Sequence, residues 1–392
     1  MRTLDIDQLL IENVISAATA PASEISARVA DLGPATVAEV ALAEVAGRAA
    51  LHGRPAIEQV GIQFQLAFGS ARLDYVVHLG PEKIAIEASS SEDAPVTIKQ
   101  DLVDLLYETF GPAGNHGATR EVAIMETVPA VDPADPVHRR RAAAVTAFRQ
   151  LLVALSGRRP SLTDLALAFG SDKWGGHWYT PLYERYFEPY SEQQVKVLEI
   201  GVGGYRAVDA GGASLRMWKH YFRRGMIYGL DLFDKSGLTE PRLRILQGDQ
   251  GDQEFLATMA REHGPFDIVI DDGSHFCHHV IASFNALFPH VRPGGMYVVE
   301  DLQTSYWPGW GGNVDPTASG TSMSMIKSLL DGLNHQEQMR EGGSATLTTE
   351  RLVTGVHAHH NIVFIDKGLN TEQGAPAWIP RTAEIQRLYD SE

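Results

Sequence analysis

Apolar residues in the first third of the chain change from helical spacing to strict alternation. The helical spacing comes first, in a run that includes Leu9, Leu10, Val14 and Ile15. Between residues 61 and 88, apolar and polar residues alternate in three short runs, separated by glycine-containing dipeptides at 69–70 and 80–81. Alternation is typical of strands buried on one face, and such dipeptides are typical of turns. The pattern predicts a helix, then a three-stranded antiparallel meander, and a second helix at 101–111 that covers its apolar face.

The segment 128–141 contains three prolines and follows neither period. A helix is expected after it, at 142–155, followed by a short polar stretch. At 392 residues the chain is long for a single core, and polar segments of this kind are typical of domain boundaries. We therefore place a boundary near residue 157. Residues 1–157 are expected to form a smaller auxiliary α+β domain, and residues 158–392 a second domain.

From residue 195 the apolar runs become short and continuous, with longer helical patterns between them. The five runs read VKVLEIG, GMIYGLD, LRILQGD, PFDIVIDD and GGMYVVED. Continuous apolarity indicates strands that are buried on both faces, as in a parallel sheet covered by helices. This half of the chain is therefore predicted to be α/β, with a doubly wound, Rossmann-like architecture.

Composition narrows the range of functions. With 33 basic and 49 acidic side chains the net charge is -16, which disfavours nucleic acid and anionic membrane surfaces as partners. No stretch approaches the roughly 18 consecutive apolar residues of a membrane span, and acidic residues interrupt the apolar N-terminus where a signal peptide would be continuous. The single cysteine, Cys277, excludes an intrachain disulfide and a CxxC metal site. We expect a cytoplasmic protein with no membrane or nucleic-acid partner.

The ends of the first three parallel strands carry residues suited to a nucleoside ligand. The first strand leads into an E-x-G-x-G motif, formed by Glu199, Gly201 and Gly203. A dinucleotide fingerprint would require glycine where the chain has Arg206. The second strand ends at Asp231, placed to accept both ribose hydroxyls, and the third at Asp249, placed to reach an adenine amino group. Each acid alone is equally well explained as a strand-end residue in water, but the succession of three favours an adenosine-containing ligand.

The fourth and fifth strands each end in two acids. These are Asp271 and Asp272 on the fourth strand, and Glu300 and Asp301 on the fifth. If the strands are neighbours, four carboxylates meet at one edge, where two charges about 4 Å apart repel by about 4 kcal/mol at an effective dielectric constant of about 20. A divalent cation would relieve this repulsion, and oxygen ligands favour Mg²⁺. The alternative is that Asp272 or Ser274 only caps the following helix.

Taken together, these motifs resemble those of a known enzyme family. The motifs are LEIGVGGY, GGASLRMWKHYF, GLDLF, QGDQGD, IVIDDGSH and VVEDLQTSYW, preceded by the lead-in segment GSDKWGGHWYTPLYERYF at 170–187. They resemble the class I S-adenosylmethionine-dependent methyltransferases, and within these the macrolide sugar O-methyltransferases. The resemblance covers residues 165–310, and the N-terminal half is similar to the auxiliary domain of the same group.

The resemblance implies transfer of a methyl group from S-adenosylmethionine, with Mg²⁺, to a deoxysugar hydroxyl of a macrolide antibiotic intermediate, expected to be the 2''-hydroxyl. It also implies a homo-oligomer, expected to be a tetramer, in which the N-terminal domain assists assembly and encloses the glycosylated macrolide substrate. Two alternatives stay open: a catechol-type enzyme acting on a small phenol, and a non-catalytic S-adenosylmethionine-binding protein. The long N-terminal domain disfavours the first, and the intact acidic cluster disfavours the second.

The same resemblance implies roles for individual residues. His275 is the expected base, with His278 and His279 as second candidates, and the expected metal ligands are Asp272, Glu300 and Asp301. The residues expected to bind the cofactor are Thr180, Glu199, Gly201, Gly203, Tyr205, Ser214, Asp231, Gly248, Asp249 and Asp272. A histidine alone is insufficient, because taking a proton from a hydroxyl of pKa about 15.7 to a histidine of pKa about 6.5 is uphill by about 12 kcal/mol. Metal and base are therefore expected to act together.

Two other stretches have more than one interpretation. The loop after Asp301 carries three large aromatic residues, which are Tyr306, Trp307 and Trp310. They would suit a large apolar substrate such as a macrolactone if the loop is mobile, or they pack on the domain as an ordinary surface loop. Near the C-terminus, His357, His359 and His360 have a zinc-like spacing but no fourth ligand, so we expect a strand at the sheet edge.

Overall fold

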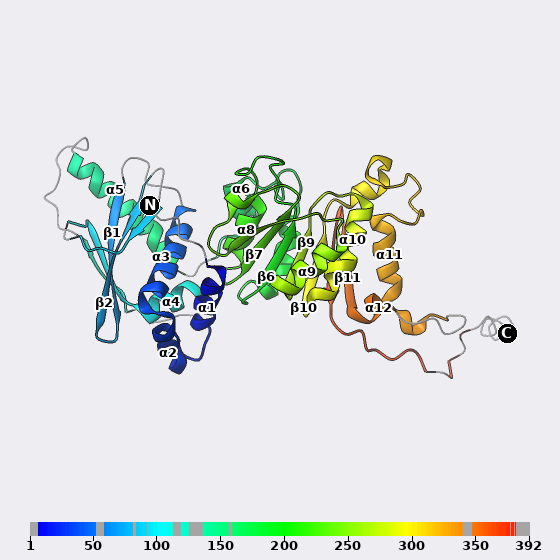
Figure 1. The fold of residues 1–392 in the computed structure, drawn as a ribbon, viewed down its shortest axis with the longest axis horizontal. Coiled ribbons are helices and arrows are strands. Elements are labelled where there is room, and N and C mark those ends of the chain that lie inside the picture. Colours follow the sequence, from blue (N-terminus) through cyan, green and yellow to red (C-terminus); the bar gives the residue numbers. More distant parts are fainter. Residues whose placement is uncertain are drawn as a thin grey trace, which may run out of the picture. The chain divides into compact units, whose positions relative to one another are not determined.

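The computed structural model describes residues 7–51, 59–80, 84–91, 93–112, 119–124, 136–156, 159–339, 347–376, 378–379 and 381. They are drawn as coloured ribbon in Figure 1. The described residues form two compact units. The first unit takes in residues up to 195 together with 207–228 and 235–245, and the second takes in 196–206, 229–234 and the residues from 246 onward. One sheet lies entirely before residue 157 and the other entirely after it. The domain boundary predicted at that point stays a prediction.

The first unit contains a five-stranded sheet with the order β3, β2, β1, β4, β5. Its strands are β1 (Val60–Phe68), β2 (Ala71–Leu79), β3 (Ile84–Glu87), β4 (Val96–Asp101) and β5 (Glu121–Ile124). The first three are antiparallel neighbours, which confirms the predicted meander and its turn at 69–70. The predicted turn at 80–81 lies partly outside the described residues. The alternation did not predict β4, which is parallel to β1, or the short and exposed β5.

Helices of the first unit match the three predicted ones, the third with an earlier start. Those that precede residue 157 are α1 (Gln8–Ala18), α2 (Ala22–Leu32), α3 (Pro34–Ala50), α4 (Leu102–Phe110) and α5 (Pro136–Leu155). α1 and α4 are the helices expected from the spacing, and α4 packs on β1 and β4. The helix predicted at 142–155 is confirmed as part of α5, but α5 begins earlier, at Pro136, so the interruption expected through residue 141 is wrong from that residue onward. Proline is tolerated in the first turn of a helix because that turn needs no N–H donor there. Residues 128–135 lie outside the described residues.

A buried ion pair joins segments of the first unit that are far apart in sequence. Arg242, only 1% exposed, donates to both carboxylate oxygens of Glu44 on α3, at 2.6 and 3.0 Å. The same guanidinium donates to backbone carbonyls of Lys219, Phe222 and Gly225. Burial opposes ionisation of Glu44, but the charges of Arg242 and Arg48 hold its pKa well below the usual range. All the donors of this arginine are thus engaged by groups that the fold brings together.

The second sheet has seven strands in the order β11, β12, β10, β9, β6, β7, β8. The strands are β6 (Lys196–Ile200), β7 (Met226–Asp231), β8 (Leu243–Gln247), β9 (Phe266–Asp271), β10 (Val291–Val299), β11 (Val353–His359) and β12 (Ile362–Lys367). β9 is parallel to β6 and β10, whereas β12 is antiparallel to β10 and β11. All five predicted strands are present, and the doubly wound α/β class is confirmed. β9 is buried along its whole length, while β8 at the edge is not.

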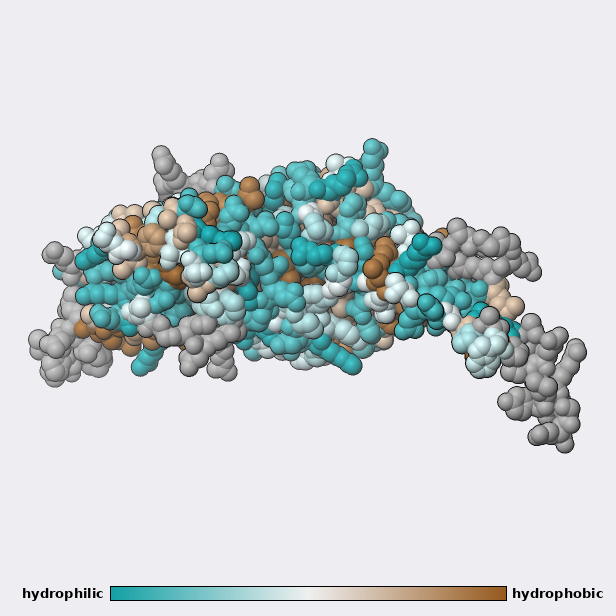
Figure 2. Space-filling model, turned by 90° about the horizontal axis from the view of Figure 1, so that it is seen from below, coloured by the Kyte–Doolittle hydropathy of each residue, from teal (hydrophilic) through white to brown (hydrophobic). Residues whose placement is uncertain are grey.

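Of the described helices that follow residue 157, the first two precede β6 and the other five lie between strands of this sheet in sequence. They are α6 (Leu162–Phe169), α7 (Thr180–Phe187), α8 (Ala213–Tyr221), α9 (Gln253–His263), α10 (Cys277–Leu287), α11 (Ser322–Gly332) and α12 (Thr348–Leu352). Among the residues that the structure describes, none of the helices is long and apolar enough to cross a membrane. The face drawn in Figure 2 is mainly hydrophilic, with small and separate apolar patches.

Candidate active site

The acidic residues of the predicted site follow neighbouring strands of the second sheet. β9 pairs with β6 on one side and β10 on the other, with Asp271 opposite both Ile200 and Val299. The carboxyl ends of three parallel strands therefore meet at one edge, as ligand sites in doubly wound sheets require. Gly201, directly after β6, has φ 96°, and a Cβ there would lie 2.1 Å from the carbonyl oxygen of Asp272. Only glycine fits this position, so the loop after β6 packs directly against the end of β9.

Two groups of potential metal ligands share Asp272. One consists of Glu199, Asp272 and Glu300, and the other of Asp272, His275 and Asp301. In each group, one ligand atom from every residue lies within 4.8 Å of the others. The three predicted ligands are thus divided, with Asp272 close to Glu300 in one group and to Asp301 in the other. Glu199, which the sequence interpretation assigned to the cofactor, also lies within the acidic cluster.

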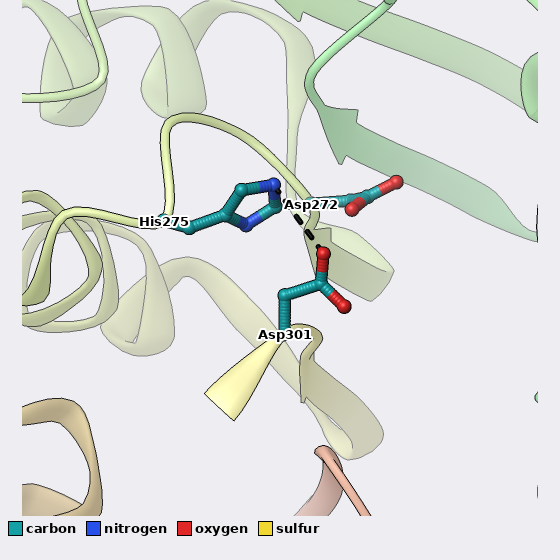
Figure 3. A group of neighbouring side chains, drawn as sticks. All are labelled: Asp272, His275 and Asp301. Atoms are coloured by element: carbon teal, nitrogen blue, oxygen red, sulfur yellow. Dashed lines mark ion pairs between the residues drawn. The ribbon is translucent and has the colours of Figure 1, made fainter. Parts of the chain in front are cut away.

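His275 and Asp301 face each other across this edge. The Nε2 atom of His275 lies 3.6 Å from Oδ2 of Asp301, and Figure 3 shows the two side chains pointing toward one another with Asp272 beside them. Both residues have left-handed backbones, with φ 57° for His275 and 54° for Asp301. This conformation costs a non-glycine residue on the order of 1 kcal/mol or more, and such strain is concentrated at functional sites. The local fold therefore holds these two side chains close together at a cost in backbone strain.

Asp271 does not belong to the cluster at the rim. Its side chain is buried and accepts hydrogen bonds from Gln250 (2.6 Å), from the hydroxyl of Ser283, and from the hydroxyl of Tyr297 (3.3 Å). Burial raises its pKa to about 6, although the hydrogen bond from Ser283 opposes the shift. The expectation of four carboxylates at one edge is therefore wrong for Asp271. Successive strand residues point to opposite sides, so Asp271 faces inward where Asp272 faces the rim.

Gln250 links Asp271 to the loop that carries the site. Its amide nitrogen donates to Asp271, and its Oε1 accepts the backbone N–H of Ser274 at 2.9 Å. Gly273 packs directly on it, since a Cβ there would lie 2.3 Å from Oε1. The loop between Asp272 and His275 is therefore fixed by a buried amide that the sequence interpretation did not single out. The only hint was its place in QGDQ, directly after Asp249.

The alternative of a simple helix cap is wrong. α10 begins at Cys277, its N-cap residue is Phe276, and no side chain caps it. Neither Asp272 nor Ser274 has that role. The Ser274 hydroxyl instead lies 2.8 Å from Nδ1 of His279, whose pKa is lowered by burial and by the neighbouring His278. Of the three histidines, His275 is the one grouped with the acids.

The predicted cofactor residues are distributed over both units. The Asp231 carboxylate fixes the start of the glycine loop, since it accepts hydrogen bonds from the backbone N–H of Val202 (3.0 Å) and of Phe233 (2.9 Å). Asp249 is exposed and accepts the N–H of Gly251, and Gly248 donates to the carbonyl of Asp231. The remaining members of the set occupy different positions. Gly203 and Tyr205 lie on the exposed part of the glycine loop, Thr180 begins α7 and is buried, and Ser214 lies in the first turn of α8.

The aromatic loop follows Asp301 directly. It forms two 3-10 turns, η4 (Leu302–Tyr306) and η5 (Pro308–Trp310). The ring of Trp310 lies 6.3 Å from His275 and 5.3 Å from Phe276, measured between centroids. The predicted histidine strand is also found: β11 is an edge strand, and His357 on it contacts Asp366 at 2.7 Å. His357, His359 and His360 belong to neither ligand group found among the described residues.

A doubly wound sheet with a glycine loop after one strand and acids at the next strand ends is typical of Rossmann-like proteins that bind nucleoside-containing ligands, a class that includes methyltransferases. The comparisons with known proteins agree. A family model described as MycE methyltransferase N-terminal matches residues 11–120. The chain is 40% identical to mycinamicin VI 2''-O-methyltransferase of Micromonospora griseorubida, over 97% of this chain and 96% of the relative. It is 42% identical to demethylmacrocin O-methyltransferase of Streptomyces fradiae, over 95% and 94%.

The same similarity extends to a solved structure. The MycE methyltransferase from the mycinamycin biosynthetic pathway, in complex with Mg, SAH and mycinamycin VI, matches with a TM-score of 0.84 and 39% identity. The match covers 99% of this chain and all of that chain. The chain therefore belongs to the family of sugar O-methyltransferases that includes the mycinamicin VI and demethylmacrocin enzymes. The resemblance inferred from the motifs is confirmed.

Proposed function

We propose that this protein transfers a methyl group from S-adenosylmethionine, with Mg²⁺, to a deoxysugar hydroxyl of a glycosylated macrolide. The acceptor we propose is the 2''-hydroxyl of an intermediate such as mycinamicin VI. One observation carries the proposal: Asp272 belongs to two sets of potential metal ligands. The first set contains Glu199 and Glu300, and the second contains His275 and Asp301. This arrangement supports a cation site directly beside a base. Membership of a family of sugar-modifying enzymes favours this function over methylation of a small phenol.

The donor set fits magnesium. The group around Asp272 and Glu300 offers only carboxylate oxygens, and Glu300 is 3% exposed while Asp272 is half-buried. Hard oxygen donors on an edge that also remains open to a substrate are typical of Mg²⁺ sites. We propose Asp272, Glu300 and Asp301 as the ligands, with Glu199 as an additional acid within reach. A bound Mg²⁺ would act as a Lewis acid that lowers the pKa of the accepting hydroxyl.

His275 is proposed to remove the proton from that hydroxyl. Its imidazole is 22% exposed, so a ligand can reach it, and its Nε2 lies 3.6 Å from the carboxylate of Asp301. A carboxylate next to a histidine orients the ring and stabilises the imidazolium that forms when the histidine takes a proton. Both residues have strained backbones, which persist only where the surrounding fold imposes them, so the fold supports a fixed position for this pair. His278 and His279 are then neighbours of the site and do not act as the base.

The remaining predicted residues are proposed to hold the methyl donor. The glycine loop offers backbone groups, Asp231 the ribose contact and Asp249 the adenine contact, while Thr180, Tyr205, Ser214 and Gly248 complete the set. S-adenosylmethionine supplies an already electrophilic methyl group, so the protein needs no nucleophile of its own. The contribution of the chain is to hold donor and acceptor at near-attack distance, which can supply most of the remaining acceleration.

We also propose a homo-oligomer, a cytoplasmic location and an auxiliary role for residues 1–157 in assembly and substrate enclosure. The match of the N-terminal family model supports a distinct role for that region, and the single cysteine is compatible with a reducing compartment. Size-exclusion chromatography with light scattering tests the assembly. The expected mass is that of four chains, and a monomer at micromolar concentration would contradict it.

The test of the reaction is product analysis. The purified protein is incubated with S-adenosylmethionine, Mg²⁺ and a panel that includes mycinamicin VI, demethylmacrocin and a simple catechol. Mass spectrometry should detect a single added methyl group on a macrolide glycoside, and NMR should place it on the 2''-oxygen. Methylation of the catechol but of no glycoside would contradict the proposal.

A further inference from the structure

Two aromatic residues beside His275 remain open to solvent. Phe276 is 36% exposed and Trp310 is 37% exposed, and their ring centroids are 5.3 Å apart. Trp310 lies 6.3 Å from the imidazole of His275. Large adjacent aromatics left exposed at the edge of a site are typical of ligand contacts, because covering them with a ligand removes apolar surface from water. We call Phe276 and Trp310 the aromatic pair.

The position of Trp310 is fixed by backbone hydrogen bonds. Its N–H donates to the carbonyl of Trp307 at 2.9 Å, and the N–H of Gly312 donates to the same carbonyl at 3.1 Å. Ser305 anchors the loop further, since its carbonyl accepts from Asn313 (2.9 Å) and its hydroxyl accepts from Met323 (3.0 Å). The loop begins directly after Asp301. The indole is therefore held at a defined distance from the proposed metal ligand and base.

The distances identify the part of the substrate that can reach this pair. A hydroxyl that gives its proton to His275 lies about 3 Å from an imidazole nitrogen. The sugar ring that carries it is only one bond away, and a pyranose is about as wide as the six-membered ring of an indole. With its hydroxyl at His275, the sugar is therefore within reach of the neighbouring ring of Trp310. The macrolactone is further from the accepting hydroxyl and need not contact this ring.

We propose that the aromatic pair stacks on the apolar face of the deoxysugar that carries the accepting hydroxyl, and thereby selects deoxygenated sugars. The inference rests on the proposed function and deepens it. The axial C–H groups of a pyranose are slightly positive, and the face of an aromatic ring is slightly negative. A sugar that lacks a hydroxyl on this face keeps the contact dry. An additional hydroxyl there loses its hydrogen bonds to water without gaining a partner.

The test compares two acceptors with one aglycone, which differ by a single hydroxyl on the sugar. The ratio of their kcat/KM values measures discrimination in the sugar subsite and cancels effects on the aglycone. The wild-type protein is expected to prefer the deoxysugar by about tenfold or more. Trp310→Leu, which keeps apolar volume but removes the flat face, should reduce the ratio to near one, and Trp310→Phe should restore most of it. Phe276→Leu should reduce the ratio in part.

Trp307 provides the matched control. It lies three residues earlier on the same loop and is 48% exposed. Trp307→Leu should leave the sugar ratio unchanged, whatever it does to binding of the macrolactone. Affinity for S-adenosylhomocysteine, measured calorimetrically, should be equal in all variants and so reports that each is folded.

An unchanged ratio in Trp310→Leu, or an equal loss in Trp307→Leu, would overturn the inference while leaving the proposed reaction intact. Failure of the wild-type protein to methylate any glycoside would instead count against the proposed function itself.

Discussion

Replacing Gln250 by methionine tests whether the buried amide fixes the loop that carries Asp272 and His275. Methionine has nearly the same length and volume as glutamine, so the change removes hydrogen bonds without opening a cavity. The lost bonds are a short one to the Asp271 carboxylate at 2.6 Å, one from the N–H of Ser274 at 2.9 Å, and a long one to the Ser283 hydroxyl at 3.4 Å. Gln250 is 7% exposed, so water does not readily replace them.

The expected loss of stability follows mainly from the two shorter bonds, to Asp271 and from Ser274. A buried bond to a charged group contributes about 1.5–3 kcal/mol and a neutral one about 0.5–1.5 kcal/mol, so the free energy of unfolding should fall by about 2–4 kcal/mol. Because the released loop includes Asp272, the Mg²⁺ concentration needed for half-maximal activity should rise about tenfold or more. The turnover number should fall as His275 loses its position.

Urea denaturation and Mg²⁺ titration of methyl transfer measure these effects. Gln247→Met is the matched control, because Gln247 is exposed and its amide bonds only to the carbonyl of Leu232, at 3.2 Å. This control should change the free energy of unfolding by less than about 0.5 kcal/mol. If Gln250→Met destabilises no more than Gln247→Met, or leaves the Mg²⁺ requirement unchanged, Gln250 does not position the loop.

Three other substitutions test separate parts of the account. His275→Ala should lower kcat by about 100-fold or more while S-adenosylhomocysteine binds as before, and a near-normal kcat would place the base elsewhere. Arg242→Met should cost about 3–5 kcal/mol in urea denaturation, because the buried carboxylate of Glu44 loses its bidentate partner and keeps only Arg48. The double variant Arg242→Met/Glu44→Gln should cost less, and the opposite order would contradict a buried ion pair. Burial lowers the pKa of His220 to about 3, so the folded protein resists a proton that the unfolded chain takes up below pH about 6.5. The free energy of unfolding of the wild-type protein should therefore decrease as pH falls from 6.5 toward 3. His220→Phe retains the stacking on Phe169, and its free energy of unfolding should decrease less between pH 7 and pH 5. Equal decreases in the two proteins would refute the assignment to His220.

Much of the second sheet could be predicted because its strands are continuous apolar runs. Their carboxyl ends carry the acids, so the meeting of Asp272 with Glu300 followed once β9 and β10 proved to be neighbours. In the first unit, β4 and β5 were not predicted. Both are short, and their pairing depends on contacts with residues distant in sequence.

The site itself was only partly accessible from the sequence. The direction of each side chain at a strand end decides that Asp271 points inward and Asp272 outward, and two adjacent acids in a sequence do not reveal it. The role of Gln250 depends on partners 21 and 24 residues away. The left-handed backbones of His275 and Asp301 also have no sequence signal, since non-glycine residues adopt them only where the surrounding fold imposes them.

Metal dependence of product formation tests the central claim most directly. The protein is treated with EDTA, and methylated macrolide is then quantified by mass spectrometry before and after Mg²⁺ is restored, for the wild type and for Asp272→Asn. The account predicts no product from the chelated wild type, recovery with Mg²⁺, and little recovery in Asp272→Asn. Undiminished methylation after thorough chelation would contradict it.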